Sequence, residues 1–192
     1  MHVDYWDYIG WKDPFASPEV TNRQRAYAKT MTLPYVYTPQ MVVQGGAEGT
    51  GSDRRKIKKL IRTAQRDADK NPPVVVQLTR TGDERLRIHI GTSGDQPSRP
   101  ADIYLITFER ERTVQVKRGE NRGRTLTHRN VVRTIGPVGS WTGAAFETTA
   151  QVPRTQTIPD KSGGPPPPRS AAVLVQAANT GAILGANVIA LD

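Results

Sequence analysis

The stretch Leu33-Pro34-Tyr35-Val36-Tyr37-Thr38-Pro39-Gln40-Met41-Val42-Val43 decides the fold of this 192-residue chain. Its aliphatic residues predict a buried strand. Thr38-Pro39 interrupts that strand, because proline has a fixed φ and no amide hydrogen to give to a sheet. The glycines that follow, at Gly45-Gly46 and between Gly49 and Gly51, predict a turn-rich loop.

A helix is predicted on the N-terminal side of this stretch. Ser17 is a favourable N-cap, Pro18 suits the first helical position, and Glu19 lies in the first turn, where the helix dipole favours an acid. We therefore expect a helix from Pro18 to Lys29. The preceding residues 2–8 alternate between apolar and acidic side chains, which predicts the end of a strand.

A second helix is predicted on the C-terminal side, with Ser52 as its N-cap and Asp53 as its first residue. Its apolar residues recur at the spacing of one helix face: Ile57, Leu60, Ile61, Ala64 and Ala68. The opposite face carries Arg54, Arg55, Lys56, Lys58, Lys59, Arg62 and Arg66. Such a face either binds an anionic surface or is simply solvated, and the sequence favours the solvated interpretation. Asn71-Pro72-Pro73 ends the helix and forms a linker.

The chain beyond this linker is predicted to be all β. Short apolar runs alternate with turn residues at regular spacing, which is typical of a β-sandwich or barrel. The expected strands cover 74–79, 86–90, 103–109, 114–118, 126–135, 143–150, 172–177 and 183–190. The Pro-rich segment 159–168 is expected to be an exposed loop, and the alternative is a ligand for an aromatic groove. The predicted fold class is therefore α+β.

The chain contains 27 basic and 18 acidic residues, for a formal net charge of +9, and no cysteine. The basic residues are spread along the chain and no nucleic-acid-binding module is visible, so we expect no specific nucleic-acid partner. No apolar run approaches the ~20 residues that span a bilayer. The first residues do not form a signal peptide, so the chain as written would stay in the cytoplasm.

Few residues suggest catalysis or metal binding, and neither is predicted. His2, Asp4 and Asp7 are too few and too mixed a set for a metal site. His89 alternates with apolar neighbours and is expected to face solvent, and His128 has no acid beside it in the sequence. We therefore expect no catalytic residue, no metal and no cofactor.

Several segments closely resemble one bacterial family. They are His2-Val3-Asp4-Tyr5-Trp6-Asp7-Tyr8-Ile9-Gly10-Trp11-Lys12-Asp13, Arg23-Gln24-Arg25-Ala26-Tyr27, Tyr37-Thr38-Pro39-Gln40 and Arg118-Gly119-Glu120-Asn121-Arg122-Gly123-Arg124-Thr125-Leu126-Thr127-His128. All of them are similar to domain-of-unknown-function family 1223. The resemblance implies a periplasmic or secreted protein with an incomplete thioredoxin-like domain over 1–70, a linker over 71–73 and an antiparallel β-sandwich over 74–192.

Members of this family normally carry a signal peptide and a Cys-x-x-Cys helix before the segment that begins this chain. The resemblance therefore implies that Met1 is an internal methionine, with a genuine start at Met1 as the alternative. It also implies that the complete form resembles a thiol–disulfide oxidoreductase. The chain itself has no cysteine and is expected to be redox-inactive, because a thiolate is the nucleophile in such chemistry.

The resemblance further indicates where a protein or peptide would bind. Pro39 is implied to be a cis proline, with the backbone of Thr38 pairing to a bound peptide strand. The aromatic cluster Tyr5, Trp6, Tyr8 and Trp11 either lines this site, with Trp6 and Trp11 at its periphery, or belongs to the core. The alternative function is a non-enzymatic envelope module that binds a protein or glycan through its β-sandwich. The oligomeric state stays open.

Overall fold

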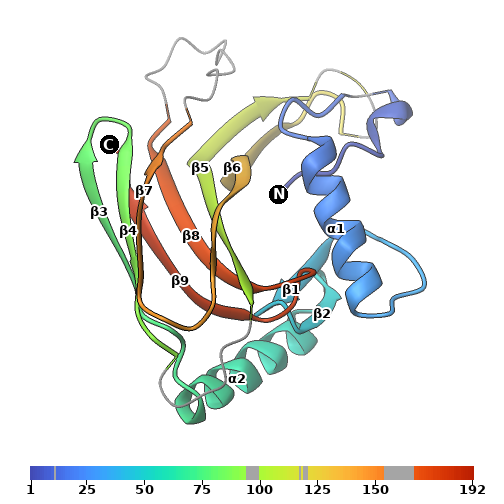
Figure 1. Cartoon of the computed structure of the whole chain (residues 1–192). Coiled ribbons are helices and arrows are strands. Elements are labelled where there is room, and N and C mark those ends of the chain that lie inside the picture. Colours follow the sequence, from blue (N-terminus) through green and yellow to red (C-terminus); the bar gives the residue numbers. More distant parts are fainter. Residues whose placement is uncertain (11, 94–99, 117, 119–120, 154–166) are drawn as a thin grey trace.

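The computed structural model describes residues 1–10, 12–93, 100–116, 118, 121–153 and 167–192. It is a mixed helix and sheet structure with antiparallel sheets, as the sequence predicts. The helices and a short hairpin come first along the chain, and the strands of two larger sheets follow (Figure 1). Trp11 and residues 159–166 of the Pro-rich loop lie outside the described residues.

The N-terminal part contains a 3₁₀ helix (Asp7–Ile9), α1 (Pro18–Thr30), the hairpin of β1 (Gln40–Val43) and β2 (Ala47–Thr50), and α2 (Arg54–Lys70). α1 begins where the sequence predicts, because the Ser17 hydroxyl accepts a hydrogen bond from the Val20 amide. α2 begins one residue later than predicted. Its N-cap is Asp53, not Ser52, since the Asp53 carboxylate accepts from the Lys56 amide at 2.9 Å.

The strand end predicted over residues 2–8 is wrong, because two tight turns take its place. The amide of Asp7 donates to the carbonyl of Asp4, and the amide of Ile9 donates to the carbonyl of Trp6. Aspartates favour such turns because their short side chains also bond to nearby backbone groups. The alternation of apolar and acidic residues here therefore reflects a folded-back segment and not an extended one.

The C-terminal part forms two antiparallel sheets. One has the order β3-β4-β7, and the other has the order β6-β5-β8-β9. The bounds are β3 (Val76–Gly82), β4 (Arg85–Ile90), β5 (Ala101–Gln115), β6 (Thr125–Trp141), β7 (Phe146–Gln151), β8 (Arg169–Ala177) and β9 (Ile183–Ala190).

The prediction of two separate strands over 103–109 and 114–118 is also wrong, since 103–115 belongs to one long strand, β5. The charged residues between them look like a turn in the sequence. In the fold, however, Glu109 and Arg112 are both buried, with Arg112 Nε 3.5 Å from the Glu109 carboxylate. Arg133 on β6 lies 3.5 Å from the same carboxylate. A buried carboxylate with two guanidinium partners lets the strand continue through a polar stretch.

One hydrophobic core lies between the two larger sheets. Leu86, Ile88 and Ile90 of β4 are fully buried, at every second position, as expected for one face of a strand. They pack in one cluster with Ile103 of β5 and with Val173 of β8. The N-terminal part rests on the four-stranded sheet of this core, to which α1 is hydrogen-bonded.

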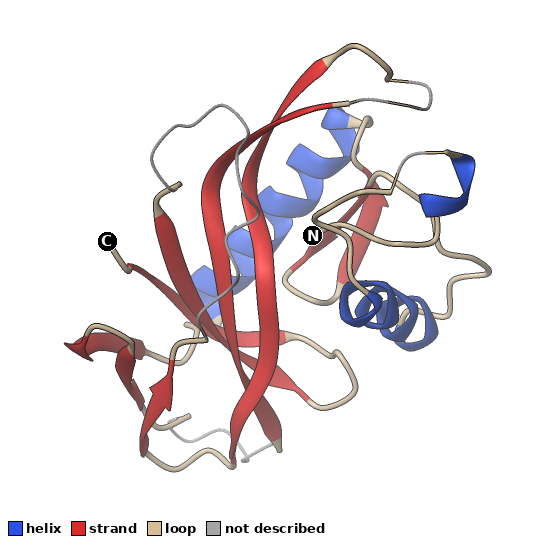
Figure 2. Ribbon diagram, turned by 90° about the horizontal axis from the view of Figure 1, so that it is seen from above, coloured by secondary structure: helices blue, strands red, loops and turns tan. Residues whose placement is uncertain are grey.

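α1 and α2 are attached to the rest of the protein in different ways. Gln176 of β8 is fully buried, and its amide nitrogen donates to the Tyr27 hydroxyl of α1 at 2.8 Å. Its amide oxygen accepts from Arg23 of α1 at 2.5 Å. α2 instead buries Ile57 toward the β1–β2 hairpin, where Gly49 leaves room for it. Figure 2 shows α1 end-on and α2 lengthwise, so the two helices run in different directions.

Candidate functional site

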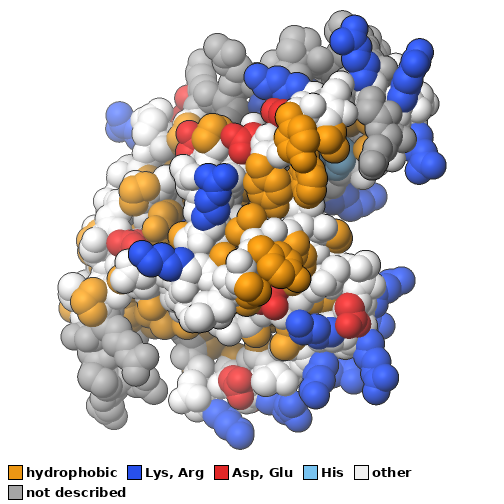
Figure 3. All heavy atoms as spheres, turned by 90° about the vertical axis from the view of Figure 1, so that its right-hand side faces the viewer, with side chains coloured by type: hydrophobic (Ala, Val, Ile, Leu, Met, Phe, Trp, Pro, Cys, Tyr) orange, Lys and Arg blue, Asp and Glu red, His pale blue; other side chains and the backbone are white. Residues whose placement is uncertain are grey.

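A cleft of about 800 Å³ lies between the N-terminal part and the four-stranded sheet. Residues from the N-terminal segment, α1 and 38–45 form one side, and β5, β6, β8 and β9 form the other. The apolar residues that line it include Trp6, Ile9, Pro39, Met41, Val114, Val116, Leu126, Leu174 and Ile183. Hydrophobic side chains gather in the middle of this side of the molecule (Figure 3). Clefts of this size and character are typical of ligand sites.

The Thr38-Pro39 segment lies on the wall of this cleft. Its peptide bond is cis, as the family resemblance implied. The Trp6 indole nitrogen donates to the Thr38 hydroxyl at 3.0 Å, which fixes the N-terminal segment against this loop. Trp6 is 43% exposed and Tyr8 is 78% exposed, so the core interpretation is wrong for these two aromatics. The structure thus brings together three of the four predicted site residues, and Trp11 lies outside the described residues.

The outer edge of β1 also faces the cleft. The carbonyls of Pro39 and Val43 accept hydrogen bonds from the β2 side, from Gly51 and Gly46. In an antiparallel pair the residues alternate between bonding to the partner and pointing away from it. The backbone N–H and C=O groups of Gln40 and Val42 therefore point away from β2. In the described ranges no other strand pairs with β1. Just past its end the Gln44 carbonyl accepts from the Ile183 amide of β9, so the open part of this edge is Gln40–Val42.

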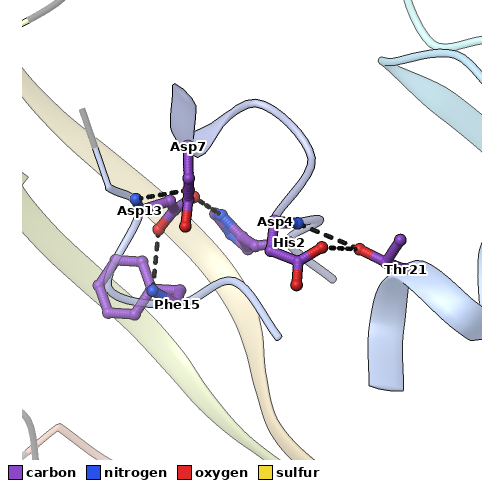
Figure 4. A network of polar contacts seen from close by, with 6 residues as sticks. All are labelled: His2, Asp4, Asp7, Asp13, Phe15 and Thr21. Atoms are coloured by element: carbon purple, nitrogen blue, oxygen red, sulfur yellow. Dashed lines mark hydrogen bonds and ion pairs between the residues drawn. The ribbon is translucent and has the colours of Figure 1, made fainter. Parts of the chain in front are cut away.

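A polar cluster at the N-terminal end of the cleft was not predicted. His2 Nδ1 and the Asp13 carboxylate are joined by a hydrogen bond of 2.6 Å, and that carboxylate also accepts from the Phe15 amide at 2.8 Å (Figure 4). The Asp13 amide in turn donates to Asp7 at 3.1 Å. Burial raises the pKa of Asp13, but the hydrogen bonds from His2 and Phe15 outweigh it and hold that pKa below its ordinary value.

His128 on β6 completes this cluster. Its ring centre lies 4.9 Å from that of His2 and 5.7 Å from that of Phe15, in edge-to-face geometry. Burial lowers the pKa of His128, and the charge of His2 lowers it further. The sequence could not indicate this contact, because His128 meets residues more than a hundred positions away along the chain. In the described part of the chain, neither histidine is hydrogen-bonded to a hydroxyl or thiol.

The third histidine lies away from this cluster, on β4. His89 is half-exposed, as predicted, and lies 3.9 Å from Glu147. Among the residues that the structure describes, no group of three His, Cys, Asp or Glu side chains could hold a metal ion. No described helix is long and apolar enough to cross a bilayer.

Residues 1–176 match the family described as "Protein of unknown function (DUF1223)". The chain belongs to this family. A crystal structure of an Agrobacterium tumefaciens protein, a structural-genomics target, is similar, with 30% sequence identity and a TM-score of 0.77. The match covers 100% of this chain and 78% of that one. Among curated proteins no significant match is found.

Proposed function

We propose that this DUF1223 protein binds an extended, apolar segment of another polypeptide in the cleft beside Thr38-Pro39. The observation that carries this proposal is the open edge of β1 beside an apolar cleft. Gln40 and Val42 offer backbone donors and acceptors that an added strand would pair with. Strand addition of this kind takes its affinity from main-chain hydrogen bonds and its specificity from pockets for alternate side chains.

Three features of the cleft support an apolar, extended ligand. Alternate side chains of an added strand would point toward the sheet wall, where Val114, Leu126 and Leu174 present an apolar surface. Thr38 is held by Trp6, so the loop that precedes β1 is already fixed before a ligand arrives. A pre-organised site loses less conformational freedom on binding.

We further propose that this site belongs to a thioredoxin-like protein of the bacterial envelope. The order of α1, β1, β2 and α2, together with the Tyr37-Thr38-Pro39-Gln40 motif, supports that assignment. In family members that carry a Cys-x-x-Cys segment, the same cleft would present a substrate for thiol–disulfide exchange. The present chain has no cysteine, so its proposed role is binding without electron transfer.

The test uses a synthetic octapeptide of alternating valine and serine with capped ends, titrated by calorimetry and by tryptophan fluorescence. Val42→Pro removes the outward amide while leaving the bonds between β1 and β2, since edge strands tolerate proline where the N–H faces outward. We expect this variant to lose at least about tenfold in affinity, by the loss of one or more main-chain hydrogen bonds. Val42→Ala keeps the amide and serves as the matched control.

A second ligand separates strand addition from simple apolar binding. Two forms of the same peptide, N-methylated at its odd or at its even residues, each lose the amide donors of one strand edge and keep their side chains. Unchanged affinity for both N-methylated forms would contradict strand addition. Binding that survives Val42→Pro but fails in Leu126→Ala would favour the alternative function, in which the β-sheet alone recognises the partner.

A further inference from the structure

The outer face of α2 carries a row of basic side chains. Eight residues line a shallow groove along the helix. Two of them are Gln65 and Asp69, and the other six are cations: Arg54, Arg55, Lys58, Lys59, Arg62 and Arg66. Lys and Arg side chains crowd the lower edge of the molecule in Figure 3, where α2 lies. The row from Arg54 to Arg66 is ~18 Å long at the rise of an α-helix.

These charges lower the stability of the helix that carries them. Arg54 and Arg55 occupy the first turn of α2, which contains no acidic residue, although the positive end of the helix dipole favours acids there. Like charges also recur four residues apart, as in Arg55–Lys59 and Lys58–Arg62, and such pairs are destabilising. A helix selected only for stability would alternate the signs of its charges.

The rest of the protein does not neutralise this row. Among the described residues, none of the six cations has a carboxylate within 4.0 Å. α2 forms an ion pair through Lys56 instead, 3.8 Å from Glu48. The apolar side of α2 already packs on the β1–β2 hairpin through Ile57. The cationic face is therefore not used for folding.

We infer that this face docks the protein on an anionic phospholipid bilayer. Clusters of four to eight Lys and Arg on an amphipathic helix are the pattern that recognises anionic lipid headgroups. A single straight helix on the outside of the molecule can bring all six cations to one plane. Ile61, 41% exposed, borders the row and adds an aliphatic contact at the interface.

The same face is less suited to nucleic acid. It presents no aromatic side chain for stacking on bases, and Gln65 is its one amide. Its cationic side chains are long and flexible, which suits a mobile layer of headgroups. A neutral bilayer has no net negative charge to attract these cations, so the proposal requires anionic lipid.

The experiment measures co-sedimentation of the whole chain with vesicles of phosphatidylcholine containing 30% phosphatidylglycerol, at 50 and 500 mM salt. We expect binding at low salt, loss at high salt, and no binding to pure phosphatidylcholine. The triple variant Arg55→Gln, Lys59→Gln, Arg62→Gln should bind at least about 100-fold more weakly, since each cation contributes about fivefold. Its thermal unfolding should be unchanged or shifted upward, because repulsion along the helix is relieved.

The control variant removes three exposed cations elsewhere: Arg80→Gln, Arg85→Gln and Lys29→Gln. Both triple variants have the same net charge, so a general charge effect would weaken both equally, and that result would overturn the proposal. Binding to a 20-base-pair DNA duplex in the absence of vesicle binding would overturn it as well. Selective loss in the α2 variant alone supports the lipid-binding face.

Discussion

α1 and α2 both pack on the rest of the protein, but different interactions hold them in place. α1 has an acid in its first turn and a base in its last turn, in agreement with its dipole, and buried polar groups anchor it to the four-stranded sheet. α2 has bases where acids are favoured, and apolar contact holds it on a small hairpin. Directional hydrogen bonds therefore fix the position of α1, whereas apolar packing leaves the outer charges of α2 available for another role.

The anchor of α1 gives the largest expected effect. Gln176→Leu removes the amide that bonds to Arg23, Tyr27 and the carbonyl of Gly181. Arg23 and Tyr27 would keep only the hydrogen bond between them, and the Gly181 carbonyl would lose its bond to Gln176, so we expect the free energy of unfolding to fall by about 3 kcal/mol. Denaturant titration measures this loss. The matched control is Gln77→Leu on β3, an exposed glutamine whose replacement should have almost no effect. Equal losses in both variants would refute the anchor.

Lowering the pH should weaken the attachment of the N-terminal segment, by less than the loss of Gln176. Burial and His2 lower the pKa of His128 in the folded protein, so the unfolded chain takes up its proton first as the pH falls. Stability is therefore complete above pH ~6.5 and decreases below it, through the folded pKa. Thermal unfolding at pH 7.5 and 5.5 measures the decrease, which should shrink in His128→Asn and persist in His89→Asn, the control at a half-exposed histidine.

The cap of α2 gives a smaller and more local effect. Asp53→Ala removes the acceptor for the Lys56 amide, and loss of an N-cap costs about 1 kcal/mol. Ser52→Ala tests the cap that the sequence predicted, and it should change the free energy of unfolding little. Denaturant titration of both variants decides between the two caps; a larger loss in Ser52→Ala would restore the sequence-based assignment.

Charge reversal gives the smallest effect, and its sign distinguishes the two helices. Arg55→Glu places an acid in the first turn of α2 and relieves repulsion with Lys59, so the free energy of unfolding should rise by about 0.5 kcal/mol. Glu19→Arg on α1 makes the reverse change and should lower it. Thermal unfolding at low salt compares them, and the difference should fade at 500 mM salt. A destabilised Arg55→Glu protein would contradict the charge conflict in α2.

Local signals in the sequence predicted local structure well. The start of α1 and the bounds of β9 follow from caps and turn residues that act within a few positions. The continuous strand β5 could not be predicted, because its charged stretch is stabilised by Arg133, which lies far along the chain on β6. The contact of His128 with His2 could not be predicted either, because the two residues are far apart along the chain. At the site, the Thr38-Pro39 loop and Trp6 were predicted through family resemblance. The exposure of Trp6 was not predicted, because it depends on two turns in a segment whose alternating apolar and acidic residues predicted a strand.

The hydrogen bond between Arg23 and Gln176 spans 153 residues of sequence. During synthesis at 5–20 residues per second, α1 therefore emerges from the ribosome about 8 to 30 s before its anchor has been translated. During that interval the Arg23 side chain and the β1 edge are exposed to whatever the nascent chain meets. A chaperone that covers this surface, or a pause that prolongs the wait, would thus act on the yield of folded protein without changing its final stability.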